Sequence, residues 1–232
     1  MTSLILIAAL VMNQGADAPK KPETMQLRMP LGTIIKSELK LIFSDPAEDF
    51  MMTTIDHFES KVIAIGPDEI SFEHKVSPVY IKMDGLEKST PDAEPSIVNE
   101  TRNRVGCLKK YEGTIVDEQA NLMIARLWTV PLPNKYPNIG SDWVFTDQRF
   151  IPYEFKGVSR QELENKLILD VSYKGLDGDP LDMRGTAAIQ VSSGWPMRID
   201  LKGKGCLVPG GEGERVSLTL EWVTKEVIIP KS

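Results

Sequence analysis

The chain has 232 residues and a hydrophobic content of 41%, which is enough to form a real core and excludes a disordered protein. Its formal net charge is −6, from 33 acidic and 27 basic residues. Lysine and arginine form no continuous stripe that would offset this charge. Nucleic-acid binding is therefore not expected, because a phosphate backbone would be repelled.

The first eighteen residues have the pattern of a secretory signal peptide. Their apolar run, Leu4 to Met12, is too short to span a bilayer, and Ala16 and Ala18 stand where a signal peptidase reads small residues. No lysine or arginine precedes the run and Pro19 follows the cleavage point, so a buried N-terminal strand is the alternative. No later stretch could cross a membrane. We predict a secreted or periplasmic protein that is not transmembrane.

Three strands are predicted in the first third of the chain. The first ends at Phe43, before the turn Ser44–Pro46, and the second covers Phe50–Ile65. The third follows the turn Gly66–Asp68, and Pro78 is expected to bend it or to place it at a sheet edge. Apolar and polar side chains alternate along these segments, so each strand has one face to bury.

Residues 84–104 interrupt this alternation. They contain Gly85, Pro91, Pro95 and many charged side chains, so we predict a long surface loop. The loop divides the chain into two β-rich parts, of which the first is too small to fold alone. With residues 1–18 removed as a signal peptide, the remainder (19–232) is expected to form a single β-rich domain.

One helix is predicted, over residues 117–128. Asp117 suits its N-cap, and Pro131 and Pro133 cannot continue it. Apolar residues recur at helical spacing, at Ala120, Met123, Ile124, Leu127 and Trp128. A strand is the alternative, because Trp128–Val130 has strand propensity.

The last seventy or so residues alternate most clearly, with roughly four strands in succession. An antiparallel sheet with a single apolar face needs a cover, and the predicted helix can supply it. The fold is therefore predicted to be mainly β (α+β). We expect a curved antiparallel sheet or half-barrel with one packed helix near 117–128, and a two-sheet β-sandwich is the alternative.

Two short motifs are similar to segments of exported β-sheet proteins. Leu132-Pro133 is followed by Gly140-Ser141-Asp142-Trp143 at a strand start, and a late hairpin carries Gly194-Trp195-Pro196. With the signal peptide and the helix, the chain resembles secreted bacterial half-barrel proteins related to the lipoprotein-carrier fold, mostly of unknown function. The resemblance covers roughly Leu27 to Val223 in organisation. It implies a concave apolar face plugged by a helix, and the carriers it evokes move lipid-anchored proteins or bind apolar chains. No ligand contact of that group maps onto a residue here, and the cysteine that anchors lipid in many relatives is absent.

Cys107 and Cys206 are the only cysteines. An oxidising compartment would let them form a disulfide, and two separate buried thiols are the alternative. They lack the Cys-x-x-Cys spacing of a redox pair or a zinc site.

Each of the two histidines could have a functional role or a purely structural one. His74 shares the parity of Phe72 and Val76, so we expect a hydrogen-bonded core histidine rather than a catalytic base. His57 and Glu59 share a strand face and could contribute to a metal site, but no third or fourth ligand is evident. A solvated strand face is the stronger interpretation.

The remaining motifs lie in predicted turns and loops. Asp177, Asp179 and Asp182 could hold calcium, but aspartate and glycine also dominate hairpin turns. The glycine-rich segment Pro209–Glu214 is predicted to be a hairpin loop rather than a phosphate site, because no lysine–serine/threonine pair follows it and its glutamates would repel an anion. Asn99-Glu100-Thr101 matches a glycosylation acceptor. No catalytic, cofactor-binding or metal-binding residue is assigned, and no cofactor is predicted.

We therefore predict a non-catalytic exported protein that binds a lipid or other apolar ligand on the concave sheet face. The large side chains of Tyr173, Trp195, Met197 and Trp222 suggest this face. The alternative is an envelope structural or protein-interaction module, with a filled core and an envelope protein as its partner. A hydrolase is the third possibility, and no nucleophile–base pair in the sequence supports it.

Overall fold

The computed structural model describes most of the chain. The ranges are residues 23–45, 47–83, 86–89, 94–113, 118–148, 152–209 and 213–231. The predicted signal peptide lies outside them, as do the predicted N-cap Asp117 and the centre of the glycine-rich loop, 210–212.

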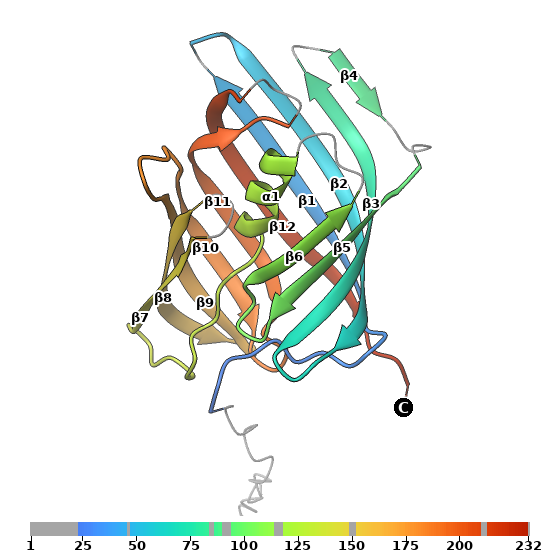
Figure 1. Cartoon of the computed structure of the whole chain (residues 1–232), viewed down its shortest axis with the longest axis vertical. Helices are drawn as coiled ribbons and strands as arrows, with labels where there is room; N and C mark the ends of the chain where they lie inside the picture. Colours follow the sequence, from blue (N-terminus) through green and yellow to red (C-terminus); the bar gives the residue numbers. More distant parts are fainter. Residues whose placement is uncertain are drawn as a thin grey trace, which may run out of the picture.

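One antiparallel sheet of twelve strands curves around the helix α1 (Glu118–Leu127) (Figure 1). The strands are β1 (Ile34–Asp45), β2 (Phe50–Ile65), β3 (Glu69–Met83), β4 (Leu86–Ser89), β5 (Ser96–Asn103), β6 (Leu108–Gly113), β7 (Asp142–Asp147), β8 (Tyr153–Leu163), β9 (Lys166–Gly175), β10 (Asp182–Gln190), β11 (Pro196–Leu207) and β12 (Arg215–Ile228). The described residues contain no other helix. The mainly β prediction, with one curved sheet and one packed helix, is confirmed, and the β-sandwich alternative is not observed.

The strands follow the order β6-β5-β3-β2-β1-β12-β11-β10-β9-β8-β7, and β4 pairs with β3 alone. The first and last strands, β1 and β12, are hydrogen-bonded to each other at the centre of the sheet. The two edges of the path are β6 and β7, which flank α1 in the sequence. The chain therefore passes from one edge to the other through the helix, across the concave side, and the sheet stays open.

Two-residue alternation explains which strand faces are buried. On β9 the side chains of Leu167, Leu169, Val171 and Tyr173 are all buried, and their neighbours are more exposed. Along a strand, the buried positions switch between odd and even residue numbers only at a β-bulge. The β2–β3 register shifts between Ile55 and Asp56, next to Pro78, where β3 changes its other partner from β5 to β4.

The helix α1 packs its predicted apolar stripe against the sheet. The buried side chains are those of Ala120, Met123, Ile124, Leu127 and, just beyond the helix, Trp128. Pro131 and Pro133 follow in an extended segment. The helical interpretation of this segment is confirmed, and the strand alternative is not.

The predicted loop over residues 84–104 was wrong for much of its length. Leu86–Ser89 and Ser96–Asn103 are strands, and the second pairs with β3 along eight residues. The buried positions of β5 are Val98, Glu100 and Arg102. Charged residues on the inner face remove the apolar alternation by which a strand is normally identified.

The segment before β1 closes one end of the curved sheet. Met25, Leu27 and Met29 are buried there. The backbone N–H of Leu27 donates to the carbonyl of Arg104 (2.7 Å), and that of Arg28 to the carbonyl of Ser193 (2.8 Å). This segment crosses the lower end of the molecule in Figure 1 and joins the β5–β6 turn to the β10–β11 turn.

Candidate functional site

A cavity of about 480 Å³ lies on the concave side of the sheet, between β1, β2, β3, β5, β6 and α1. Its lining is mainly apolar and consists of Leu39, Leu41, Phe43, Met52, Thr54, Asp56, Phe58, Val76, Pro78, Ile81, Ser96, Val98, Tyr111, Asn121, Ile124, Trp128 and Pro209. Its volume falls within the range of ligand sites, roughly 300–1,000 Å³, and such sites are typically lined in this way.

Strand parity determines which side chains line this cavity. On β1 they are the odd-numbered residues from Leu39 to Phe43, and on β2 the even-numbered residues from Met52 to Phe58. On β3, Val76 and Pro78 precede the bulge and Ile81 follows it. The bulge therefore turns Ile81, at an odd position, toward the same hollow as Val76.

The large side chains from which we predicted a binding face do not line this cavity. Tyr173, Trp195 and Trp222 are at most 2% exposed and belong to the filled core. Tyr173 Oη donates to the carbonyl of Thr129 (2.7 Å), and Trp195 Nε1 donates to Thr224 Oγ1 (3.2 Å). Met197 is partly buried against the same core. The sequence argument located the concave face correctly but chose its filled part.

Of the lining residues that the structure describes, Asp56 is the only charged one. Within the described part of the chain, its carboxylate has no hydrogen-bond or ion-pair partner. Burial raises the pKa of Asp56 from 3.8 to about 6, and the neighbouring His57 opposes this shift. An unpaired carboxylate inside an apolar hollow is costly, so a group that binds there gains from pairing with it.

Several other polar side chains belong to the lining, among them those of Thr54, Tyr111 and Trp128. Thr54 Oγ1 and Trp128 Nε1 are both buried and have no hydrogen-bond partner among the described residues. Burial raises the pKa of Tyr111 to about 12, so its phenol stays neutral at physiological pH. The cavity thus combines apolar walls with a few polar groups that are free to orient a ligand.

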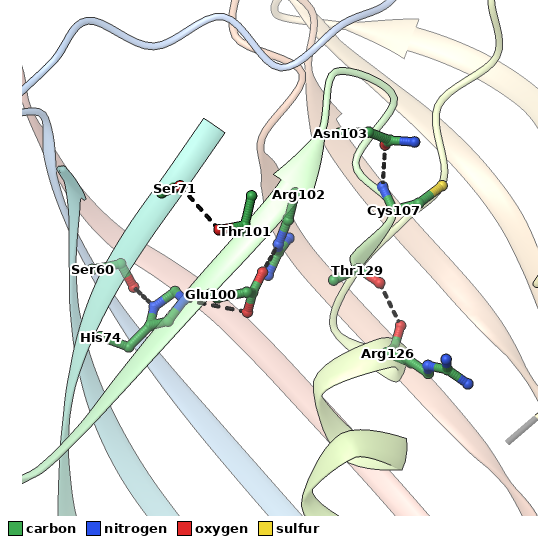
Figure 2. A network of polar contacts seen from close by, with 10 residues as sticks. All are labelled: Ser60, Ser71, His74, Glu100, Thr101, Arg102, Asn103, Cys107, Arg126 and Thr129. Carbon is green, nitrogen blue, oxygen red and sulfur yellow. Dashed lines mark hydrogen bonds and ion pairs between the residues drawn. The ribbon is translucent and has the colours of Figure 1, made fainter. Parts of the chain in front are cut away.

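A separate polar network lies deeper in the core and joins β2, β3 and β5 (Figure 2). His74 Nδ1 lies 2.7 Å from Ser60 Oγ, and His74 Nε2 lies 3.3 Å from Glu100 Oε2. The second pair is not aligned for a hydrogen bond. Glu100 forms an ion pair with Arg102, whose guanidinium stacks 5.3 Å from the ring centre of Trp195.

A serine, a histidine and a carboxylate in succession are the residue types of a catalytic triad, in which they act as nucleophile, base and acid. Ser60, His74 and Glu100 are, however, at most 1% exposed, and none of them lines the cavity. Burial, aided by the charge of Arg102, lowers the pKa of His74 to about 3, so the imidazole is neutral and a poor base. We therefore interpret the network as structural.

The structure uses the other predicted candidates in ordinary contacts. His57 is exposed and lies 3.5 Å from Glu38 on β1. Asp179 forms an ion pair with Arg215 (2.7 Å), and Asp182 pairs with Arg184 (3.2 Å). No group of three or more His, Cys, Asp or Glu in the described residues is placed to hold a metal.

Asn99 of the glycosylation match is exposed on β5. Cys107 and Cys206 are both buried, and the disulfide considered from the sequence is not present in this structure. Cys206 Sγ instead contacts Met183 Sδ at 3.5 Å. Burial raises the pKa of Cys206 to about 12.

Comparison of the chain with models of known protein families, with curated proteins and with solved structures finds no match. In the described residues, no helix has both the length and the apolar character needed to cross a bilayer.

Proposed function

We propose that this protein is a non-catalytic, exported binding protein for a lipid or other apolar small molecule, which it holds in the cavity lined by Asp56. The observation that carries the proposal is the hollow of about 480 Å³ beside an otherwise filled core. Protein interiors contain few voids larger than a water molecule. A large apolar hollow is therefore the place where a ligand would gain most from burial, at about 25 cal/mol per Å² of apolar surface.

The end of the sheet beyond the cavity offers a path for an apolar ligand. Ile81 lines the cavity and is 36% exposed. Met83 pairs with Met52 on one side and Leu86 on the other, and both Met83 and Leu86 are exposed. The apolar inner face thus continues past the cavity to the ends of β3 and β4, opposite the end that the N-terminal segment closes (Figure 1).

The alternative, a structural or protein-interaction module of the envelope, requires that the helix fill the concave face completely. The half of the sheet formed by β8 to β12 fits this requirement, because its inner aromatic side chains are buried. The cavity over β1 to β3 does not. We therefore favour ligand binding, with export inferred from the signal-like sequence of residues 1–18.

A neutral fluorescent probe tests the proposal. N-phenyl-1-naphthylamine, titrated into delipidated protein, should brighten on binding and accept energy from Trp128 in the cavity wall. Val76→Phe should weaken binding because the new ring occupies the cavity. The matched control is Val144→Phe, since Val144 is 55% exposed on β7, away from the site. Failure of the probe to bind, or equal binding by both variants, would count against the proposal.

A further inference from the structure

We infer that the ligand carries a cationic nitrogen next to its apolar chain, as an alkylammonium does, and that Asp56 binds this nitrogen. The inference rests on the proposed function and specifies the class of ligand. It follows from the charge of the lining, from its aromatic walls and from the surroundings of Asp56.

The charge of the lining excludes an anionic head group. Among the described residues that line the cavity, Asp56 is the only charged side chain and none is a lysine, arginine or histidine. The carboxylate of a fatty acid would therefore meet a like charge in a poorly solvated hollow, whereas an ammonium would meet an opposite one.

Aromatic side chains supply a second interaction that a cation can use. Phe43, Phe58, Tyr111 and Trp128 all line the cavity. The face of an aromatic ring attracts a cation, most strongly where both are shielded from water. A carboxylate together with several aromatic rings is thus a favourable environment for an ammonium group. A neutral alcohol would gain much less from the rings.

No group in the described residues already neutralises Asp56. The residue next to it along the chain is His57, whose side chain is on the outer face of β2 and exposed. The other elements around the cavity also present no charge to Asp56 from their described lining residues. Leu39 on β1 and Pro78 on β3 are apolar, and Asn121 on α1 and Tyr111 on β6 are uncharged.

The other inward-facing acid near this site shows the opposite arrangement. Glu100 on β5 is fully buried, and the chain provides it with Arg102 two residues later. Where a buried carboxylate has a structural role, the protein therefore supplies its own cation. At Asp56 that position is left open, and a cationic ligand can fill it.

Three twelve-carbon ligands that differ only in their head group test the inference. Dodecylamine, dodecanol and dodecanoate, each below its aggregation concentration, compete with N-phenyl-1-naphthylamine at pH 7.5. We expect dodecylamine to bind about tenfold more tightly than dodecanol, with dodecanoate weakest, as a charge-assisted contact predicts. At pH 5 the preference for the amine should shrink, because the pKa of Asp56 is raised to about 6 and its carboxyl is then protonated.

Two variants assign the preference to Asp56. Asp56→Asn should remove the advantage of dodecylamine over dodecanol. Glu59→Gln is the matched control, because it removes the same charge from the exposed outer face of β2. It should behave like the wild type.

The outcomes separate this inference from the proposed function. If dodecanol binds and dodecylamine binds no better, or if dodecanoate binds best, the cationic-ligand inference is overturned while the binding function stands. If Asp56→Asn keeps the amine preference, the role of Asp56 is overturned. If neither the probe nor any of the three ligands binds, both proposals fail.

Discussion

The two halves of the curved sheet have inner faces of the same apolar type, but only one of them is filled. Over β8 to β12, Phe155, Tyr173, Trp195 and Trp222 are all buried in a continuous core. Over β1 to β3, only part of the inner face is filled, and the rest lines a cavity of about 480 Å³. The position of α1 explains the difference, because among the described strands the helix makes its most extensive contact with β11. A helix held toward one half of a curved sheet leaves a hollow over the other.

The same contrast appears between two acidic residues that face the interior. Glu100 is buried beside Arg102, and the surrounding network holds three strands together. Asp56 lines the hollow without a partner among the described residues. The first carboxylate is therefore expected to contribute to stability, and the second to cost stability in the absence of ligand. The following predictions test this difference.

The largest effect is expected from Arg102→Ala. This change leaves Glu100 fully buried without its cation and should lower the free energy of unfolding by about 3–5 kcal/mol, as urea denaturation can measure. Arg198→Ala is the control, since its pair with Asp200 is on the surface and should contribute less than about 1 kcal/mol. Similar losses for both variants would refute a structural role for the network.

Asp56→Asn should stabilise the protein at high pH. The pKa of this carboxyl is raised from 3.8 in the unfolded chain to about 6 in the folded one, so ionisation favours unfolding as the pH rises through this window. The gain should reach up to about 3 kcal/mol above pH 7 and vanish only at a pH well below 3.8, where the carboxyl is protonated in both states. Thermal unfolding across this range measures it, with Glu59→Gln showing no such trend. A variant that is less stable than the wild type at pH 8 would contradict the model of an unpaired acid.

A matched pair of enlarging substitutions tests the packing of the two halves. Val171→Phe inserts a ring into the filled half, where Val171 is 3% exposed, and should cost about 1–3 kcal/mol. Val76→Phe projects the same ring into the cavity and should change stability by less than about 0.5 kcal/mol. Equal destabilisation of the two variants would mean that the hollow is not available to a side chain or to a ligand.

The smallest effect concerns the two thiols. Because Cys107 and Cys206 are buried and no disulfide joins them, and burial raises the pKa of Cys206 to about 12, a disulfide-exchange reagent should not label the native protein. Two thiols should become reactive after unfolding without reductant. If no thiol reacts after unfolding, the two cysteines form a disulfide. If a thiol reacts in the native protein, one of the cysteines is exposed.

Alternation along the chain predicted much of this architecture. The inner face of β9, with Leu167, Leu169 and Val171, could be identified from the sequence, and so could the apolar stripe of α1. The cavity side of β2 also follows this rule, since Asp56 has the parity of Phe58. That signal was present and would have identified Asp56 as an acid facing inward.

The hidden strand β5 shows where a single sequence fails. Its inner positions, Glu100 and Arg102, are charged, so their burial is intelligible only with the partners His74 and Trp195 from other strands. The local pattern of such a segment is that of a polar loop. Burial of charge depends on contacts between segments far apart in the chain, which no local periodicity contains.

The sequence by itself determined which side of each regular strand is apolar and where the one helix forms, because both depend on local geometry. Only the tertiary structure decided that the helix packs nearer β11 than β2, and hence that one half of the sheet is filled and the other is hollow. The physical reason is that a cavity is the space left between packed elements, and its existence depends on how they are placed relative to one another.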